Sequence, residues 1–298
     1  MRTELPPVIR LEDYRPPDYL IGRVALDIRL DPSRTRVTAE LELRPNPEGR
    51  PGAPLQLDGD ELTAVSVKLD GEPLADTAYA ATPGGLTLHE PPRRAFRLTT
   101  ETELDPTGNT KLMGLYRSSG TYCSQCEAEG FRRITYFLDR PDVLSVYTTR
   151  IEASREEAPV LLGNGNPVEA GEVEGTDRHY AVWHDPYPKP AYLFAVVGGR
   201  LGHVGRQFLT ASGRAVQLAV YVEQGKEGRA AYALDALERS MRWDERVFGR
   251  EYDLDVFNIV AVSDFNMGAM ENKGLNIFND KYVLASPETA TDADYAAI

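Results

Sequence analysis

The chain has 298 residues, enough for about two domains that each bury a core of their own. Its 46 Asp and Glu residues outnumber 33 Lys and Arg residues, which gives a formal net charge of -13. A surface this acidic repels nucleic-acid phosphates and anionic lipids, so we expect neither a nucleic-acid nor a membrane partner. Apolar residues make up 42% of the chain, which is enough for packed cores and argues against disorder.

The sequence carries no standard export or membrane signal. Its N-terminal segment lacks an apolar stretch behind a basic start, and its longest apolar run is the short segment 191–197. The only cysteines are Cys123 and Cys126, too few for a disulfide framework. We therefore expect a cytoplasmic protein.

The first two hundred residues are dense in strand patterns. Residues 23–30 and 37–43 both alternate apolar and polar side chains, and turn residues at 31–33 separate them, which predicts an antiparallel hairpin. A third alternating run at 65–69, with Val65 among its apolar positions, meets Asp70-Gly71, a dipeptide that favours a tight turn.

A further turn is predicted at Asn164–Pro167, where the sequence reads Asn-Gly-Asn-Pro. Short strands with regular turns are typical of a β-sandwich or a saddle-shaped sheet assembly. We therefore expect a mainly β N-terminal domain over residues 1–199.

After Gly199 the pattern changes to mixed helix and strand. Two strands are expected at 206–211 and 215–223. A helix is expected over 229–248, because its apolar residues recur at spacings of three and four, with Gly249 as its C-terminal cap.

Two more strands are expected further on, at 257–262 and in the "LNIFN" segment at 275–279. Thr291 and Asp294 have the spacing of a capping box, which predicts the start of another helix. Residues 200–298 thus form a second, α+β region.

The Cys-Ser-Gln-Cys segment at 123–126 admits three interpretations. A zinc site would need two more ligands, and the four histidines are too scattered to provide them by any recognisable spacing. A redox pair would be expected to open a helix, whereas this pair lies among strands. In the third interpretation both cysteines are small buried thiols, and the surroundings favour this one. Gln125 and Glu127, two residues apart, would share one face of an extended segment.

The segment Asn266–Phe278 places a single acid, Glu271, among Met, Asn and Gly residues, as in the wall of a pocket. If Glu271 and Glu127 met at a cleft, they would repel each other unless a cation such as a peptide ammonium lay between them. The alternative is that both are ordinary surface acids, as most of the 46 must be.

Two long segments, "CSQCEAEGFRRITYFLDRPDV" from Cys123 and "GAMENKGLNIFNDKYVLA" from Gly268, resemble the M1 (gluzincin) zinc aminopeptidases of the bacterial aminopeptidase N type. Further agreement, including "DPYPKPAYLFAVV" from Asp185, extends the resemblance over nearly the whole chain. It implies an N-terminal β-rich saddle domain at 1–199. It also implies, at 200–298, the incomplete first part of a thermolysin-like catalytic domain that carries the Gly-Ala-Met-Glu-Asn motif.

The resemblance also implies roles for individual residues. Residues 268–272 would form an edge of the substrate cleft, and Glu271 would bind the free α-amino group of a peptide. Glu127, with Gln125 beside it, would complete the amine site, and Met267 would line the pocket for the first side chain. The implied substrate-binding residues are therefore Gln125, Glu127, Met267, Gly268, Ala269, Met270, Glu271 and Asn272.

One part of the family pattern is missing from this sequence. The family holds its Zn²⁺ with a His-Glu-x-x-His helix and a later Glu, and no such motif occurs here. We therefore expect the N-terminal portion of an enzyme, with no catalytic residue and no metal ligand of its own, inactive by itself and binding no zinc. The full-length enzyme would be a Zn²⁺-dependent, monomeric aminopeptidase that acts broadly, with alanyl or basic preference, on peptides with a free N-terminus.

Two other hypotheses remain open. The chain could be a non-catalytic, β-rich peptide-binding or interaction module, or it could act through redox chemistry at Cys123 and Cys126. We also expect the apolar side chains of the 229–248 helix, such as Leu234 and Met241, to lack full cover in a chain that ends at Ile298.

Overall fold

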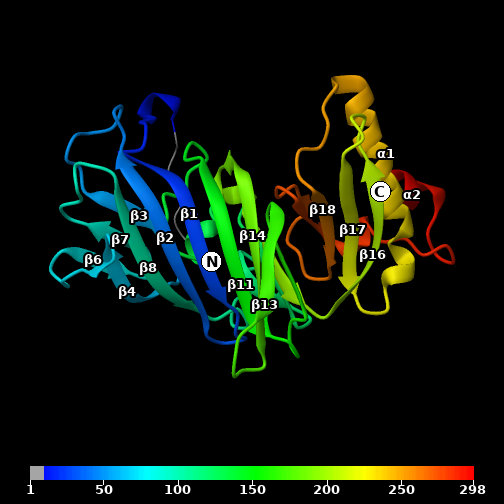
Figure 1. Ribbon diagram of the computed structural model, residues 1–298, viewed down its shortest axis with the longest axis horizontal. Coiled ribbons are helices and arrows are strands. Elements are labelled where there is room, and N and C mark those ends of the chain that lie inside the picture. Colours follow the sequence, from blue (N-terminus) through cyan, green and yellow to red (C-terminus); the bar gives the residue numbers. More distant parts are fainter. Residues whose placement is uncertain (1–9) are drawn as a thin grey trace.

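The computed structural model describes residues 10–298, which form twenty strands and two α-helices (Figure 1). The β-rich N-terminal part runs from blue to green in Figure 1, and the C-terminal part, yellow to red, lies beside it. The expected architecture is confirmed: a mainly β domain precedes an α+β region. The first nine residues of the N-terminal segment on which the absence of an export signal was argued lie outside the described residues.

The largest sheet has eight strands and contains the predicted hairpins. β1 (Tyr19–Arg29) and β2 (Thr35–Pro45) pair antiparallel on either side of Asp31–Ser33, as expected, and β1 also pairs in parallel with β11 (Ser145–Ser154). In spatial order the strands are β13 (Asn166–Glu172), β14 (Arg178–Lys189), β11 (Ser145–Ser154), β1 (Tyr19–Arg29), β2 (Thr35–Pro45), β8 (Phe96–Leu104), β4 (Thr63–Leu69) and β5 (Glu72–Pro73).

Strand β4 departs from the simple alternation expected for it. The register shifts between Ala64 and Ser66 where β4 pairs with β8, which is the signature of a bulge. Val65 is consequently 43% exposed, whereas Val67 is 4% exposed and joins the core. The alternating pattern of this run therefore places Val67 in the core but not Val65. The turn at Asp70-Gly71 is confirmed, with positive φ angles of 50° and 92°.

Two smaller sheets pack in the N-terminal part. The four-stranded one has the order β12 (Val160–Gly163), β15 (Val196–Gly199), β10 (Thr121–Gln125) and β9 (Gly114–Ser118). The three-stranded one has the order β3 (Leu55–Asp58), β7 (Gly85–Leu88) and β6 (Tyr79–Thr82). The turn predicted at Asn164–Pro167 exists, but it leads from β12 in one sheet to β13 in another.

The C-terminal part is a five-stranded sheet with α1 on one face. The order is β16 (Leu201–Leu209), β17 (Ala215–Glu223), β18 (Val256–Val262), β20 (Leu275–Asn279) and β19 (Ala269–Met270). β17, β18 and β20 are parallel, and the outer strands β16 and β19 run antiparallel to their neighbours. Five short 3-10 helices complete the described chain, at Leu11–Asp13, Phe131–Arg133, Ala191–Leu193, Glu227–Arg229 and Asp280–Tyr282.

Helix α1 (Ala231–Phe248) confirms the helix predicted over 229–248, and it ends at Gly249, whose φ of 62° is left-handed. Leu234 and Met241 are buried against the sheet, so the expectation of an uncovered apolar face is wrong. The second helix, α2 (Asp292–Ala297), starts with the predicted capping box of Thr291 and Asp294.

The alternating side chains of β18 explain how the two parts of the chain pack together. Val260 and Val262 belong to the apolar cluster of the N-terminal part, whereas Ile259 and Ala261 belong to the cluster under α1. Successive side chains of a strand point to opposite faces, so the five-stranded sheet is packed on both faces. Figure 1 shows α1 on the side of this sheet that faces away from the N-terminal part.

Only Arg200 separates β15 from β16, and the predicted domain boundary near Gly199 stays a prediction. Within residues 10–298, no helix is both long and apolar enough to span a bilayer.

Candidate functional site

The predicted site segment forms a loop, residues 263–274, between the parallel strands β18 and β20. Within it, β19 pairs antiparallel with β20, Ala269 opposite Phe278 and Met270 opposite Ile277. β19 is the last strand in the sheet order, so it is an edge strand. An edge strand of this kind can accept an extended peptide as an additional strand.

The loop divides its side chains between the core and the surface. Met270 and Asn272 are each 1% exposed, whereas Gly268, Ala269 and Glu271 are exposed. The backbone oxygen of Asn272 accepts hydrogen bonds from the Leu275 amide and the Asn276 side chain, both at 3.0 Å. The inward residues thus anchor the loop, and Glu271 stands on its outer side.

The two predicted segments meet at Gln125. This residue is buried at the end of β10, and its Nε2 lies 2.6 Å from the Met267 sulfur. Residues 142 apart in the chain are therefore neighbours, and Met267 is still 38% exposed. The structure therefore brings Gln125 next to Met267, the residue that precedes the motif.

Glu127 is half-buried and lies beyond the end of β10, in a turn. The argument that Gln125 and Glu127 share a face by strand alternation is wrong, because the strand ends at Gln125. The Glu127 amide instead folds back to donate a hydrogen bond to Gln125 Oε1 at 3.4 Å. The meeting of Glu127 and Glu271 at one cleft stays a prediction.

The lysine that follows the motif is held away from it. Lys273 Nζ forms an ion pair with Asp253 at 2.5 Å and lies 4.9 Å from the centre of the Tyr187 ring. Lys273 is the nearest cation to Glu271 in the sequence, and its charge is directed to Asp253.

Polar contacts join the loop to the N-terminal part at both ends, and no sequence pattern predicted them. Near its start, Ser118 Oγ donates a hydrogen bond to Asp264 Oδ2 at 2.9 Å. Near its end, buried Asn164 donates from Nδ2 to the Lys273 oxygen at 2.9 Å. These partners are 146 and 109 residues apart, so no local pattern in the sequence could have paired them.

The two cysteines are buried and free. Burial raises the pKa of Cys123 to about 12 and also raises the pKa of Cys126. Thiol redox chemistry proceeds through the thiolate, which these environments disfavour. The interpretation of Cys123 and Cys126 as small buried core residues therefore fits the structure better than the redox hypothesis does.

The residues present do not form a zinc site. Across the described range 10–298, no group of three or more His, Cys, Asp and Glu side chains is arranged to hold a metal ion. The sequence resemblance implied a zinc ion for a full-length enzyme only, and the described residues offer no set of ligands for one.

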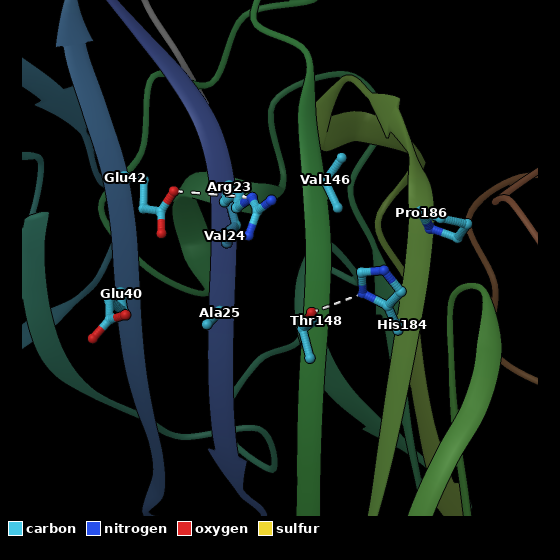
Figure 2. A pocket seen from close by; sticks show the side chains of 9 residues that line it. All are labelled: Arg23, Val24, Ala25, Glu40, Glu42, Val146, Thr148, His184 and Pro186. Carbon is cyan, nitrogen blue, oxygen red and sulfur yellow. Dashed lines mark hydrogen bonds and ion pairs between the residues drawn. The ribbon is translucent and has the colours of Figure 1, made fainter. Parts of the chain in front are cut away.

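A surface hollow of about 430 Å³ lies elsewhere, over β1, β2, β11 and β14 (Figure 2). Figure 2 shows Arg23 directed toward Glu42, at 4.0 Å, and His184 Nδ1 bonded to the Thr148 hydroxyl at 2.9 Å. None of the predicted site residues lines this hollow. It belongs to the polar outer face of the eight-stranded sheet.

Comparison with known families agrees with this arrangement. Residues 17–193 match the Peptidase M1 N-terminal domain, and residues 232–298 match the Peptidase family M1 domain. Together with the fold, these two matches place the chain in a family of peptidases. The chain belongs to peptidase family M1, as the sequence resemblance indicated.

The chain is similar to aminopeptidase N of Caulobacter vibrioides, with 56% identity over 298 residues, 100% of this chain and 34% of that protein. It is 50% identical to aminopeptidase N of Escherichia coli over 296 residues, 99% of this chain and 33% of that protein. The chain therefore spans about a third of the length of these curated relatives.

Among solved structures, the chain resembles aminopeptidase A of Legionella pneumophila, determined in complex with aspartic acid. The TM-score is 0.91 and the identity 35%, over 97% of this chain and 34% of that one.

Proposed function

We propose that this chain supplies the amine-recognition site of an aminopeptidase that removes N-terminal residues from peptides, broadly and with alanyl or basic preference. The contact between Gln125 and Met267 carries the proposal, because it joins the two motif segments across the two parts of the chain. The similarity to proteins named aminopeptidase N supports the same reading. Residues 1–199 and 200–298 are proposed as the two domains that contribute to the site.

Each residue of the site has a proposed role. Glu271 and Glu127, with Gln125 beside Glu127, form the site for the ammonium group of the peptide, and Met267 lines the pocket for its first side chain. The backbone of residues 268–272 pairs with the peptide main chain, which the edge position of β19 favours. Since Met270 and Asn272 are buried, they contribute through their backbone and by anchoring the loop.

This arrangement explains a requirement for a free N-terminus. Two carboxylates close together repel each other, and an ammonium between them relieves that repulsion. An acetylated or internal peptide offers no positive charge there, so its binding would leave both carboxylates desolvated and unpaired.

Hydrolysis itself needs groups beyond those described. The family implies Zn²⁺ in the full-length enzyme, which we propose to be monomeric and cytoplasmic. We propose that the 298-residue chain alone binds peptide amines without turning them over.

Calorimetric titration of the 298-residue chain with L-alanine amide and with N-acetyl-L-alanine amide tests the proposal. We expect only the free amine to bind, and Glu271→Gln and Glu127→Gln each to weaken it about 10- to 100-fold, the equivalent of one lost charge-assisted hydrogen bond. Glu129→Gln is the matched control, because Glu129 lies in the same turn as Glu127 but pairs with Arg132 at 3.5 Å. Equal binding of the two amides, or unchanged binding by Glu271→Gln, would refute the site.

A further inference from the structure

The start of the site loop is joined to the β9–β10 hairpin by a reciprocal pair of hydrogen bonds. The Asp264 amide donates to Ser118 Oγ at 3.1 Å, and Ser118 Oγ donates to Asp264 Oδ2 at 2.9 Å. The Tyr116 hydroxyl adds a third bond by donating to the Asp264 backbone oxygen at 2.9 Å. The backbone and the side chain of Asp264 are thus both held by strand β9.

The next residues of the loop follow the same hairpin toward Gln125. Asn266 Nδ2 donates to the Leu112 oxygen at 3.1 Å, just before β9 begins, and Met267 then meets Gln125. Gln125 pairs with Gly114, at the end of the hairpin opposite to Ser118. The loop therefore runs antiparallel to β9, with Asp264 at the hairpin turn and Met267 at its open end.

The two sides of this contact differ in burial. Ser118 and Tyr116 are buried within the four-stranded sheet, whereas Asp264 and Asn266 are exposed. The five-stranded sheet pairs with the loop at Ala269 and Met270, and Asn279 of β20 also donates hydrogen bonds to the Gly268 oxygen at 3.0 Å and to the Phe265 oxygen at 3.3 Å. The hairpin therefore holds the loop at Asp264 and Asn266, and β20 holds it at Phe265 and Gly268.

We propose that Ser118 and Asp264 are positioning residues that fix the register of the loop along the hairpin, so that Met267 and Glu271 are presented to Gln125 and Glu127. The proposal rests on the proposed amine site and deepens it. In this proposal neither residue contacts the peptide, and both act by holding the start of the loop in place on β9. Loss of their bonds would let the loop shift along β9 and weaken amine binding while the fold persists.

The chain contains a matched control for this contact. The Asp255 amide donates to Asn166 Oδ1 at 2.7 Å, and Asn166 Nδ2 donates to Asp255 Oδ2 at 3.1 Å. This second reciprocal pair also joins the two parts of the chain, but it lies outside the loop. Its removal should cost stability alone.

The test uses the 298-residue chain with its methionine methyl groups labelled with ¹³C. The NMR resonance of the Met267 methyl reports the position of the loop without any ligand, and titration with L-alanine amide reports the affinity. We expect Ser118→Ala and Asp264→Ala to shift the Met267 resonance and to weaken binding about three- to tenfold, in the range of one or two lost hydrogen bonds. Asp264→Asn, which keeps an acceptor oxygen, should restore both readouts, and Asn166→Ala should change neither.

The outcomes separate the two proposals. If Ser118→Ala and Asp264→Ala leave the Met267 resonance and the affinity as in the unaltered chain, the positioning role is overturned. If Asn166→Ala weakens binding as much as Ser118→Ala does, the contact is merely structural and the proposal fails. If the unaltered chain binds no L-alanine amide, the proposed function fails, and the Met267 resonance still decides whether Ser118 and Asp264 set the register.

Discussion

The two ends of the site loop are held in different ways. Its C-terminal end is buried: Met270 packs in the core, Asn164 reaches Lys273 from inside the protein, and Gly274 abuts Gly165. Its N-terminal end lies at the surface, where Asp264 and Asn266 are exposed and hydrogen-bond to β9 and the residues before it.

The difference assigns separate tasks to the two ends. Buried apolar contacts and fully buried hydrogen bonds contribute most to stability, whereas exposed polar contacts contribute little free energy and mainly select a geometry. We therefore expect changes at the buried end to lower stability strongly, and changes at the exposed end to affect ligand binding more than stability.

Met270→Ala should produce the largest effect. It removes a side chain that is fully packed in the core, and large-to-small substitutions at such sites cost about 2–5 kcal/mol. Urea unfolding followed by circular dichroism measures this loss. Met267→Ala is the control at the exposed end and should cost much less, so equal losses would remove the distinction between the two ends.

Asn164→Ala should produce the second-largest loss of stability. Its amide donates to the Leu193 and Lys273 oxygens, and its oxygen accepts from the Ala195 amide at 2.7 Å. Removing it leaves buried backbone groups without partners, at about 1–3 kcal/mol. The same unfolding measurement applies, and a loss near zero would mean that water replaces the amide at no cost.

Gly274→Ala should lower the free energy of unfolding somewhat less than Asn164→Ala does. This substitution tests the backbone conformation at the buried end of the loop. Gly274 has a φ of 74°, and an added Cβ would lie 2.9 Å from Leu254 Cδ1 and 3.2 Å from the Gly165 nitrogen. A left-handed conformation costs a residue with a side chain roughly 1–2 kcal/mol, and the crowding adds to this. Gly249→Ala, with a φ of 62° and open space around it, isolates the conformational part. Equal losses in the two variants would show that the contact with Gly165 is loose.

The smallest effect that we expect concerns the pH dependence of stability. It involves Glu223, which accepts a hydrogen bond from Ser263, the first residue of the loop. A hydrogen bond from the Ser263 hydroxyl, and then the Lys226 ammonium, lower the pKa of Glu223 below its usual range. In the window just below that range, the unfolded chain binds a proton that the folded chain does not, so stability falls as the pH drops through it. Thermal unfolding measured between pH 6 and pH 3 covers the ordinary pKa of Glu, about 4.3. As the pH falls over this range, the stability of Glu223→Gln should decline less steeply than that of the unaltered chain. The exposed control Glu90→Gln should leave the slope unchanged, and an unchanged slope in Glu223→Gln would contradict this coupling.

The sequence predicted local structure well where a local pattern decides it. The hairpin around Asp31–Ser33, the cap at Gly249 and the capping box at Thr291 each depend on residues within a few positions of one another. Local patterns failed at Val65, because a bulge depends on the partner strand, and at Glu127, because β10 ends before it.

The long-range contacts of the site could not be predicted in the same way. Ser118, Asn164 and Asp264 are common polar residues in unremarkable surroundings, and their partners lie more than a hundred residues away. Only the folded arrangement of the hairpin, the β12–β13 turn and the loop gives them a role. The motif segments were found because the sequence resembles a known family; the contacts that hold those segments required coordinates.

We propose that one carboxylate from each part of the chain binds the same ammonium group. A crystal structure of the 298-residue chain with bound L-alanine amide tests it most directly. The account predicts the amine nitrogen within about 3.2 Å of an oxygen of both Glu127 and Glu271. An amine bound elsewhere, or bound to one of these carboxylates with the other turned away, would contradict it.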